Sequence, residues 1–234
     1  MKWSIEDFVY GATDGAVTTF AVVAGVVGAS LSPSIILILG FANLFADGFS
    51  MAIGNYLSSK SRIEYIERER KREEWEIDNL AEQEINEIRN IYSEKGFRDE
   101  LLEEVTKVIT SKRKVWVDTM MKEELGLIHN KSENPRNKAI TTFVAFNLIG
   151  LIPLIPFIFA YVMVSSSSSM YIVIEDIFIY SIIFTAISFF SVGMIKGKVV
   201  NKSPVKSGLS TLGMGGMAAL VAFIVGYLLS QYVI

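Results

Sequence analysis

The chain has 234 residues, of which 51% are hydrophobic, and a formal net charge of −3. Its charges are segregated, because 17 of the 22 Lys and Arg and 19 of the 25 Asp and Glu lie in residues 58–138. The rest of the chain consists mainly of uncharged stretches of roughly 20 residues or more, the length of a membrane-spanning helix. This pattern excludes an ordinary soluble domain and predicts a polytopic membrane protein with one water-soluble insert. The absence of cysteine excludes disulfides and thiolate metal sites.

Five membrane spans are predicted in chain order, at residues 8–29, 35–57, 139–163, 177–195 and 207–234. The chain then divides into helices 1 and 2 (residues 1–57), an insert (residues 58–137) and helices 3 to 5 (residues 138–234). Pro153 and Pro156 are expected to bend or break the third span near its far end. Glycines 208, 213, 215 and 216 give the last span a surface for close packing. The predicted fold class is an all-α membrane protein.

The basic residues predict how the chain is oriented in the membrane. Lys2, the insert and four lysines in residues 196–206 all fall on one side of a five-span protein. The two opposite loops, at residues 30–34 and 164–176, contain no Lys or Arg. By the positive-inside rule, the insert and the N-terminus are expected in the cytosol and the C-terminus outside.

The insert is predicted to be a small helical subdomain. Residues 58–76 extend the second span without Gly or Pro, and three further helices follow, the first ending at Gly96 and the last at Gly126. Their apolar residues recur at helical spacing and can form a core. His129, the single histidine, lies in a loop-like segment and is expected to be an ordinary solvated residue.

The second span carries a polar stripe. Asn43, Asp47, Met51 and Asn55 each follow the previous one by four residues. On an α-helix this spacing places them on one face, over about 18 Å at ~1.5 Å per residue. Polar and ionisable groups inside a bilayer are costly, and they usually face a partner helix or a wet pathway. The stripe is therefore a candidate transport path.

Asp14 is the candidate ionisable residue of the first span. It lies about two turns inside that span, and Gly11 and Gly15 on either side allow close helix contact. A carboxylate at that depth is expected to be paired, metal-bound or partly protonated, unless it reaches the interface. We expect two protomers to contact each other through this part of the span.

The insert contains acidic pairs that share helix faces. Two pairs are spaced i, i+3 and a sulfur–carboxylate pair is spaced i, i+4: Glu73 with Glu76, Glu84 with Glu87, and Met120 with Glu124. Like charges at this spacing destabilise a helix, whereas a divalent cation between them would find hard oxygen ligands. A solvated charged helix is the alternative interpretation. A ferritin-type di-iron bundle is disfavoured, because it needs Glu-x-x-His twice and the chain has one histidine.

Four segments of the chain resemble the vacuolar iron transporter family: DGAVTTFAVVAG, ADGFSMAIGNYLSSKS, WVDTMMKEELGL and GLIPLIPF. The resemblance covers nearly the whole chain, including the order of the spans and the insert. It implies a five-span homodimer with its ion path at the protomer interface. It also implies a cytosolic helical domain that collects divalent metal, and exchange of Fe²⁺ for protons.

Carried over by position, the resemblance assigns residues to two sites. The path would include Asp14 and Met51. The ligands in the insert would be Glu73, Glu76, Glu84, Glu87, Met120 and Glu124. Where the family is expected to have a glutamate this chain has Asn43, and Asp47, one turn away, is expected to take over its role.

The sequence therefore predicts a transporter that exports Fe²⁺, and also Mn²⁺, from the cytosol in exchange for protons. The alternatives are a transporter chiefly for Mn²⁺, Co²⁺ or Zn²⁺, and a membrane metal sensor or scaffold that transports nothing. No nucleophile–base set, phosphate loop or zinc motif indicates an enzyme. The expected partners are divalent ions, protons, the lipid bilayer and a second copy of the chain, with no nucleic acid and no permanently bound cofactor. The expected location is the cell membrane of a prokaryote or the vacuolar membrane of a eukaryote.

Overall fold

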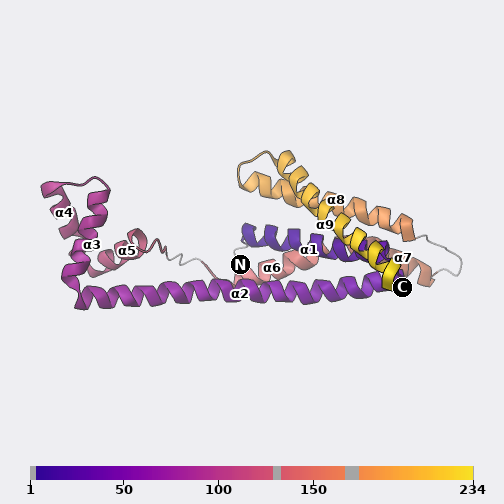
Figure 1. The fold of residues 1–234 in the computed structure, drawn as a ribbon, viewed down its shortest axis with the longest axis horizontal. Helices are drawn as coiled ribbons and strands as arrows, with labels where there is room; N and C mark the ends of the chain where they lie inside the picture. Colours follow the sequence, from indigo (N-terminus) through magenta and orange to yellow (C-terminus); the bar gives the residue numbers. More distant parts are fainter. Residues whose placement is uncertain (1–3, 129–132, 167–173, 234) are drawn as a thin grey trace. The chain divides into compact units, whose positions relative to one another are not determined.

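The computed structural model describes residues 4–128, 133–166 and 174–233. Within these ranges the chain forms α-helices and a 3₁₀ turn, without a strand. Its contacts divide it into two compact units (Figure 1). We call Met1–Tyr56 with Pro135–Ile234 the membrane unit, and Leu57–Asn134 the insert. Helix α2 contributes residues to both units.

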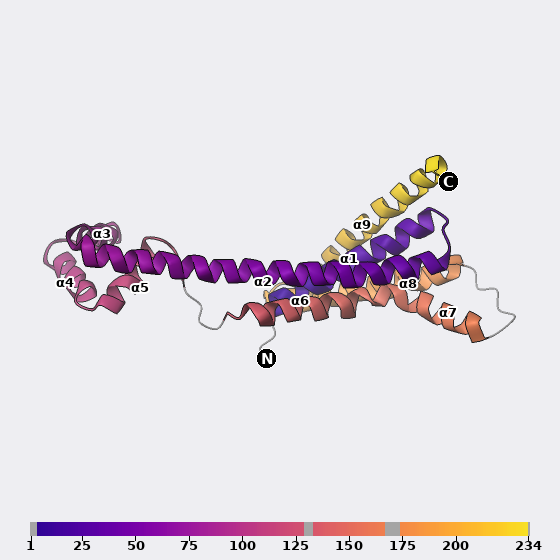
Figure 2. The same ribbon diagram turned by 90° about the horizontal axis from the view of Figure 1, so that it is seen from below.

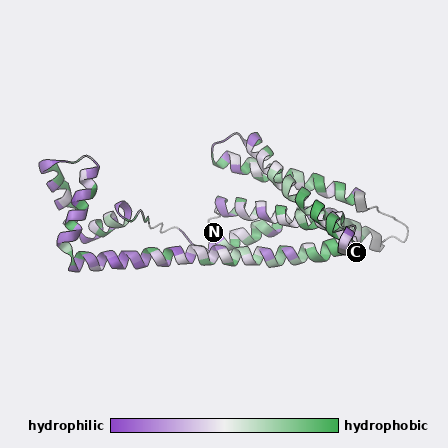
Figure 3. Ribbon diagram, in the orientation of Figure 1, coloured by the Kyte–Doolittle hydropathy of each residue, from purple (hydrophilic) through white to green (hydrophobic). Residues whose placement is uncertain are grey.

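The membrane unit contains the apolar helices. They are α1 (Ile5–Gly28), the first part of α2 (Pro33–Asn79), α6 (Pro135–Gly150), the 3₁₀ turn η1 (Ile152–Leu154), α7 (Ile155–Ser166), α8 (Ile174–Val199) and α9 (Pro204–Val233). Among the described residues, five helical segments are long and apolar enough to cross a membrane, with α6, η1 and α7 forming one of them. Figure 3 shows their predominantly hydrophobic colouring. The prediction of an all-α membrane protein with five spans is confirmed.

The third span is broken where the two prolines predicted a bend. Helix α6 ends at Gly150, and α7 starts at Ile155 after the turn η1. Proline lacks the N–H that would continue the helical hydrogen bonds, so nearby carbonyl groups need other partners. The buried hydroxyl of Ser181 in α8 donates to the carbonyl oxygen of Pro153 at 2.7 Å. A neighbouring span thus supplies a hydrogen bond to a carbonyl group at the break.

Helix α1 is the central helix of the membrane unit, packed against α6, α8 and α9 (Figure 1, Figure 2). Its approach to α6 depends on Gly11 and Gly15. A Cβ atom added at Gly15 would overlap the carbonyl oxygen of Phe146 and lie 2.9 Å from its Cα atom. A Cβ atom at Gly11 would lie 3.1 Å from the Cα atom of Thr142. The expectation that these glycines serve contact between protomers is therefore wrong, because α6 of the same chain covers them.

The glycines of α9 fulfil the packing expectation only in part. Gly208 and Gly215 lie against the rings of Phe190 and Phe189 of α8. Gly213 and Gly216 would have no heavy atom within 4 Å of an added Cβ atom. Sequence alone cannot separate the two kinds, because it does not show which side of α9 packs against α8.

The described part of the insert consists of helices joined by short non-helical segments. It contains the remainder of α2, followed by α3 (Ala81–Glu94), α4 (Asp99–Thr110) and α5 (Arg113–Glu123). Gly96 and Gly126 have φ values of 100° and 64°, a region that favours glycine, and they follow the ends of α3 and α5. Its core consists of Ile66, Ile77, Ile88, Ile109, Trp116, Val117, Met120 and Met121.

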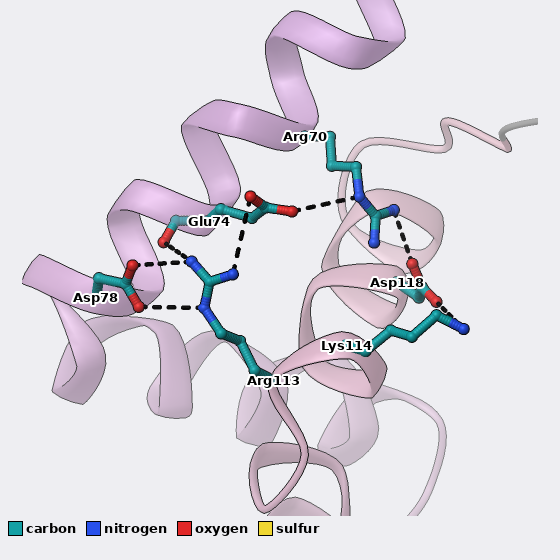
Figure 4. Close-up of polar contacts among 6 residues, drawn as sticks. All are labelled: Arg70, Glu74, Asp78, Arg113, Lys114 and Asp118. Carbon is teal, nitrogen blue, oxygen red and sulfur yellow. Dashed lines mark hydrogen bonds and ion pairs between the residues drawn. The ribbon is translucent and has the colours of Figure 1, made fainter.

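Ion pairs hold α5 against α2 in the insert (Figure 4). The guanidinium of Arg113 donates twice to Asp78, at 3.3 and 2.8 Å, and also to the carbonyl oxygen of Glu74. Arg70 of α2 lies 2.7 Å from Asp118 of α5. Each exposed pair contributes little alone, but the planar two-bond contact of Arg113 favours one geometry. The network thus fixes the position of α5 along the axis of α2.

The packing of α1 on α6 can be tested with Gly15→Ala. We expect this variant to lose roughly 1–3 kcal/mol of stability, because the added methyl group has to push the α6 backbone away. Gly216→Ala on α9 makes the same chemical change where there is open space, and it should behave like the unchanged protein. Thermal unfolding in detergent, followed by size-exclusion chromatography, measures both. Equal melting temperatures for the two variants would contradict the α1–α6 contact.

Candidate functional site

A polar seam joins α1 to α2 in the membrane unit. The Nδ2 group of Asn43 donates to Oγ1 of Thr18 at 3.3 Å, and Nδ2 of Asn55 donates to Oδ1 of Asp7 at 2.7 Å. As residue numbers rise along α1 the partner numbers fall along α2, so the helices are antiparallel here. We call this row of residues the α1–α2 seam: Asp7, Asp14, Thr18, Asn43, Asp47, Met51 and Asn55.

Asp14 and Asp47 face each other across the seam. The register of the two hydrogen bonds places them at one level, and they are close enough for their carboxylates to repel each other. Both side chains are only partly buried. Two carboxylates at membrane depth are costly unless a cation or a proton lies between them. The arrangement therefore suits a site that binds either one.

Asn43 and Met51 flank this carboxylate pair along α2. Asn43 is hydrogen-bonded to Thr18, which in turn donates to the carbonyl oxygen of Asp14 at 2.9 Å. Met51 lies one turn beyond Asp47 and packs against the apolar core of the membrane unit. The structure thus brings together the four residues expected to form the path along the α1–α2 seam.

Asp7 is a seam residue that the sequence analysis missed. The first span was expected to start at residue 8, but α1 starts at Ile5, and Asp7 is 8% exposed. Its Oδ1 atom accepts from Asn55, whereas its buried Oδ2 atom has no hydrogen-bond partner. Asn55 also donates to Thr142 of α6 at 2.8 Å. Asp7 precedes Asp14 by seven residues, or about two helical turns, which places both on one face of a helix. This spacing could have identified Asp7 from the sequence.

In the insert, two glutamates occupy positions that face the core. Glu73 is completely buried and lies on α2 between the core residues Ile66 and Ile77. Glu84 is 4% exposed and lies one turn before the core residue Ile88 on α3. Both oxygens of Glu73 and one oxygen of Glu84 have no hydrogen-bond partner. Buried carboxylate oxygens without a hydrogen bond destabilise a fold, so their presence at two such positions indicates a binding role.

Burial and neighbouring carboxylates make both groups hold their protons strongly. Burial, with the nearby charges of Glu124, Glu76 and Glu84, raises the pKa of Glu73 to about 7. Burial, with the nearby charges of Glu87, Glu76 and Glu124, raises the pKa of Glu84 to about 7. These carboxyl groups change charge near neutral pH rather than near 4.5.

The six residues expected as ligands in the insert gather in one region. Glu76 and Glu87 are partly buried, Met120 is completely buried in the core, and Glu124 follows directly after the end of α5. The backbone N–H of Glu124 donates to the carbonyl oxygen of Met120 at 3.0 Å. We call Glu73, Glu76, Glu84, Glu87 and Glu124 the acidic cluster.

The acidic cluster is a loose arrangement. Within the described parts of the chain, no three acidic side chains converge tightly enough to enclose a metal ion as they stand. Mutual repulsion separates like charges, and rotation of the long glutamate side chains can bring their oxygens together around a cation. Several carboxylates beside one thioether form a donor set that suits a first-row transition metal. His129 lies outside the described residues.

The chain matches a family of known proteins over nearly its whole length. Residues 5–227 match the sequence model of the VIT family. The chain is 37% identical over 233 residues to a vacuolar iron transporter of Toxoplasma gondii, covering 98% of this chain and 75% of that protein. It is 32% identical to a vacuolar iron transporter of Plasmodium falciparum, covering 98% and 84%. Vacuolar iron transporter 1 of Arabidopsis thaliana is also 32% identical, with 94% and 83% covered.

A match that extends over nearly every described helix establishes a common family, and it includes both the α1–α2 seam and the acidic cluster. The chain belongs to the VIT family.

Proposed function

We propose that this protein is a membrane transporter that moves Fe²⁺ out of the cytosol in exchange for protons. The observation that carries the proposal is that Glu73 and Glu84 are buried at core-facing positions of the insert, with carboxylate oxygens that accept no hydrogen bond. The names of the relatives, vacuolar iron transporters, support iron as the substrate. Mn²⁺ has similar ligand preferences and is the second expected substrate.

The insert captures the ion on the cytosolic side. The acidic cluster provides hard oxygen ligands, and the thioether of Met120 favours Fe²⁺ over Mg²⁺ and Ca²⁺. Because the carboxylates have to lose their protons to bind a metal, capture is sensitive to pH near neutrality. The cytosolic location of the insert follows from the distribution of lysine and arginine in the loops.

The α1–α2 seam conducts the ion through the membrane. Asp14 and Asp47 hold either a divalent ion or protons, since both neutralise the repulsion between two carboxylates. Met51 contributes a soft donor one turn from Asp47 along α2. Asp7, near the start of α1, offers a buried carboxylate oxygen at one end of the seam. Alternate binding of metal and protons by one site couples their opposite movements.

Two copies of the chain form the transport path together. In a single chain, the side chains of Asp14 on α1 and Asp47 on α2 are both partly exposed. Exposure of carboxylates to lipid is strongly unfavourable. A second protomer would cover them and would supply each ligand twice, as in an isologous two-fold interface.

The capture site is tested by anaerobic Fe²⁺ binding to the purified full-length protein. The raised pKa values of Glu73 and Glu84 lie near 7, so protons begin to compete as the pH falls through 7. Affinity should therefore fall between pH 8 and pH 6, by about tenfold per pH unit for each proton displaced. Equilibrium dialysis at several pH values measures it.

Glu73→Gln should abolish most of this binding, whereas Glu67→Gln, on the exposed side of the same helix, should leave it unchanged. Glu73→Gln should also stabilise the fold by about 1–3 kcal/mol at pH 8, because it removes a buried charge whose oxygens accept no hydrogen bond. An affinity that falls only near pH 4.5, or unchanged binding by Glu73→Gln, would place the capture site elsewhere.

Transport depends on Asp14. Asp14→Asn keeps the shape of the side chain but removes its charge and its proton site, so Fe²⁺ flux should fall by about two orders of magnitude or more. Proteoliposomes with and without a pH gradient provide the measurement. Asp176→Asn, near the start of α8, makes the same chemical change outside the seam. It is the matched control and should retain flux. Full flux in Asp14→Asn would exclude the seam as the path, and absence of flux in the unchanged protein would favour a sensor or scaffold.

The dimer is tested by disulfide cross-linking, because the chain has no cysteine. Val17 is partly exposed on α1, one turn from Asp14. Val17→Cys should form a covalent dimer on oxidation in the membrane. Met217→Cys, on the exposed side of α9, should remain monomeric. Cross-linking through Met217→Cys alone would place the protomer contact on α9.

A further inference from the structure

Arg72 lies beside the acidic cluster and contacts two of its members. Its Nη2 atom is 3.6 Å from Oε1 of Glu73, and its Nε atom is 3.5 Å from Oε1 of Glu76. The guanidinium is half exposed and cannot lose its charge in a protein. A permanent positive charge therefore lies within a few ångströms of the carboxylates that are proposed to bind metal.

A third carboxylate holds Arg72 from its other side. Glu69 is 4% exposed, and its Oε2 atom lies 3.0 Å from Nη1 of Arg72. Its Oε1 atom accepts two hydrogen bonds from Arg68, at 3.0 and 2.6 Å. Glu69 thus has ion pairs on both oxygens, in contrast to Glu73, whose oxygens have no hydrogen-bond partner. The contact with Glu69 is the shortest of the ion pairs that Arg72 makes.

The geometry points to Arg72 as a built-in competitor of the metal ion, which sets the affinity of the acidic cluster and is retained by Glu69 when an ion displaces it. This inference rests on the proposed capture of metal by the insert. A divalent ion that approaches Glu73 and Glu76 is repelled by the guanidinium and has to replace its contacts. Glu69 is outside the acidic cluster and already binds Arg72. The side chain of Arg72 can therefore lose its contacts with the acidic cluster and still keep an ion-pair partner.

Such a competitor makes capture reversible. Five carboxylates around one ion would bind it tightly and would release it slowly to the membrane path. A tethered cation lowers the affinity and takes up the negative charge as the ion leaves. The effect depends mainly on a positive charge near the acidic cluster. A lysine in place of Arg72 keeps that charge and should therefore retain much of the effect.

The test is Fe²⁺ binding by the purified full-length protein under anaerobic conditions at pH 8, where the carboxylates are largely ionised. Arg72→Gln should bind Fe²⁺ about tenfold more tightly than the unchanged protein, because the repulsion is gone. Arg72→Lys keeps the charge and should remain close to the unchanged protein. Arg68→Gln is the matched control: it removes the same charge from the same partner, Glu69, but Arg68 has no ion pair with Glu73 or Glu76, so the affinity should change little.

The role of Glu69 is tested by a double-mutant cycle. Glu69→Gln should weaken Fe²⁺ binding severalfold, because Arg72 then pairs more fully with Glu73 and Glu76. In the Arg72→Gln background, the same change should have little effect. An equal loss in both backgrounds would mean that Glu69 acts through its own charge, and it would overturn the retaining role. The gain in Arg72→Gln should shrink at high salt, as expected for a half-exposed charge.

The proposed capture site and this inference fail in different ways. Equal affinities of Arg72→Gln and the unchanged protein, while Glu73→Gln loses binding, would overturn the role of Arg72 and leave the capture site intact. Unchanged binding by both variants would overturn the capture site and the inference with it. Circular dichroism and gel filtration of each variant verify that the insert remains folded.

Discussion

The insert depends on one energetic constraint: two carboxylates occupy helix positions that would otherwise hold apolar side chains. Glu73 and Glu84 are buried against a core of isoleucine, tryptophan and methionine, where ionisation is unfavourable and hydrogen-bond partners are missing. The fold tolerates them because ion pairs elsewhere, such as those of Arg113 and Arg70, hold α5 on α2. Burial raises the pKa of each to about 7, so that both carboxyl groups change charge near neutral pH.

In the membrane unit, close helix packing and polar contact occur side by side along one broad face of α1. Gly11 and Gly15 allow the backbone of α6 to approach, which makes α1 the central helix. The neighbouring side chain of Thr18 accepts a hydrogen bond from Asn43 of the polar stripe on α2. One helix can thus be rigidly held and still present ionisable groups along a path, because its two roles do not share side chains.

The sequence predicted the spans and the helices of the insert, because each has a strong local signal. Long apolar runs, helical spacing and terminal glycines act over a few turns of chain. Contacts between helices were harder to predict from the sequence. Gly11 and Gly15 suggested a contact between protomers, and only the packing shows that α6 covers them. Asp7 was missed because a carboxylate near the start of a span resembles an interfacial residue, and its burial depends on Asn55 of α2.

Charge balance links the two sites. The acidic cluster contains more carboxylates than one divalent ion can neutralise, and the α1–α2 seam contains Asp7, Asp14 and Asp47 without a basic residue among the seam residues. Such groups are stable only while cations or protons accompany them. In the insert, Arg72 places a permanent positive charge beside Glu73 and Glu76. In the proposed transport cycle, it would take up part of their negative charge as an ion leaves. The seam residues include no such charge, so the proposal leaves protons as the cations that replace a departing metal ion there. The proposed exchange of metal for protons thus rests on where fixed positive charge lies and where it does not.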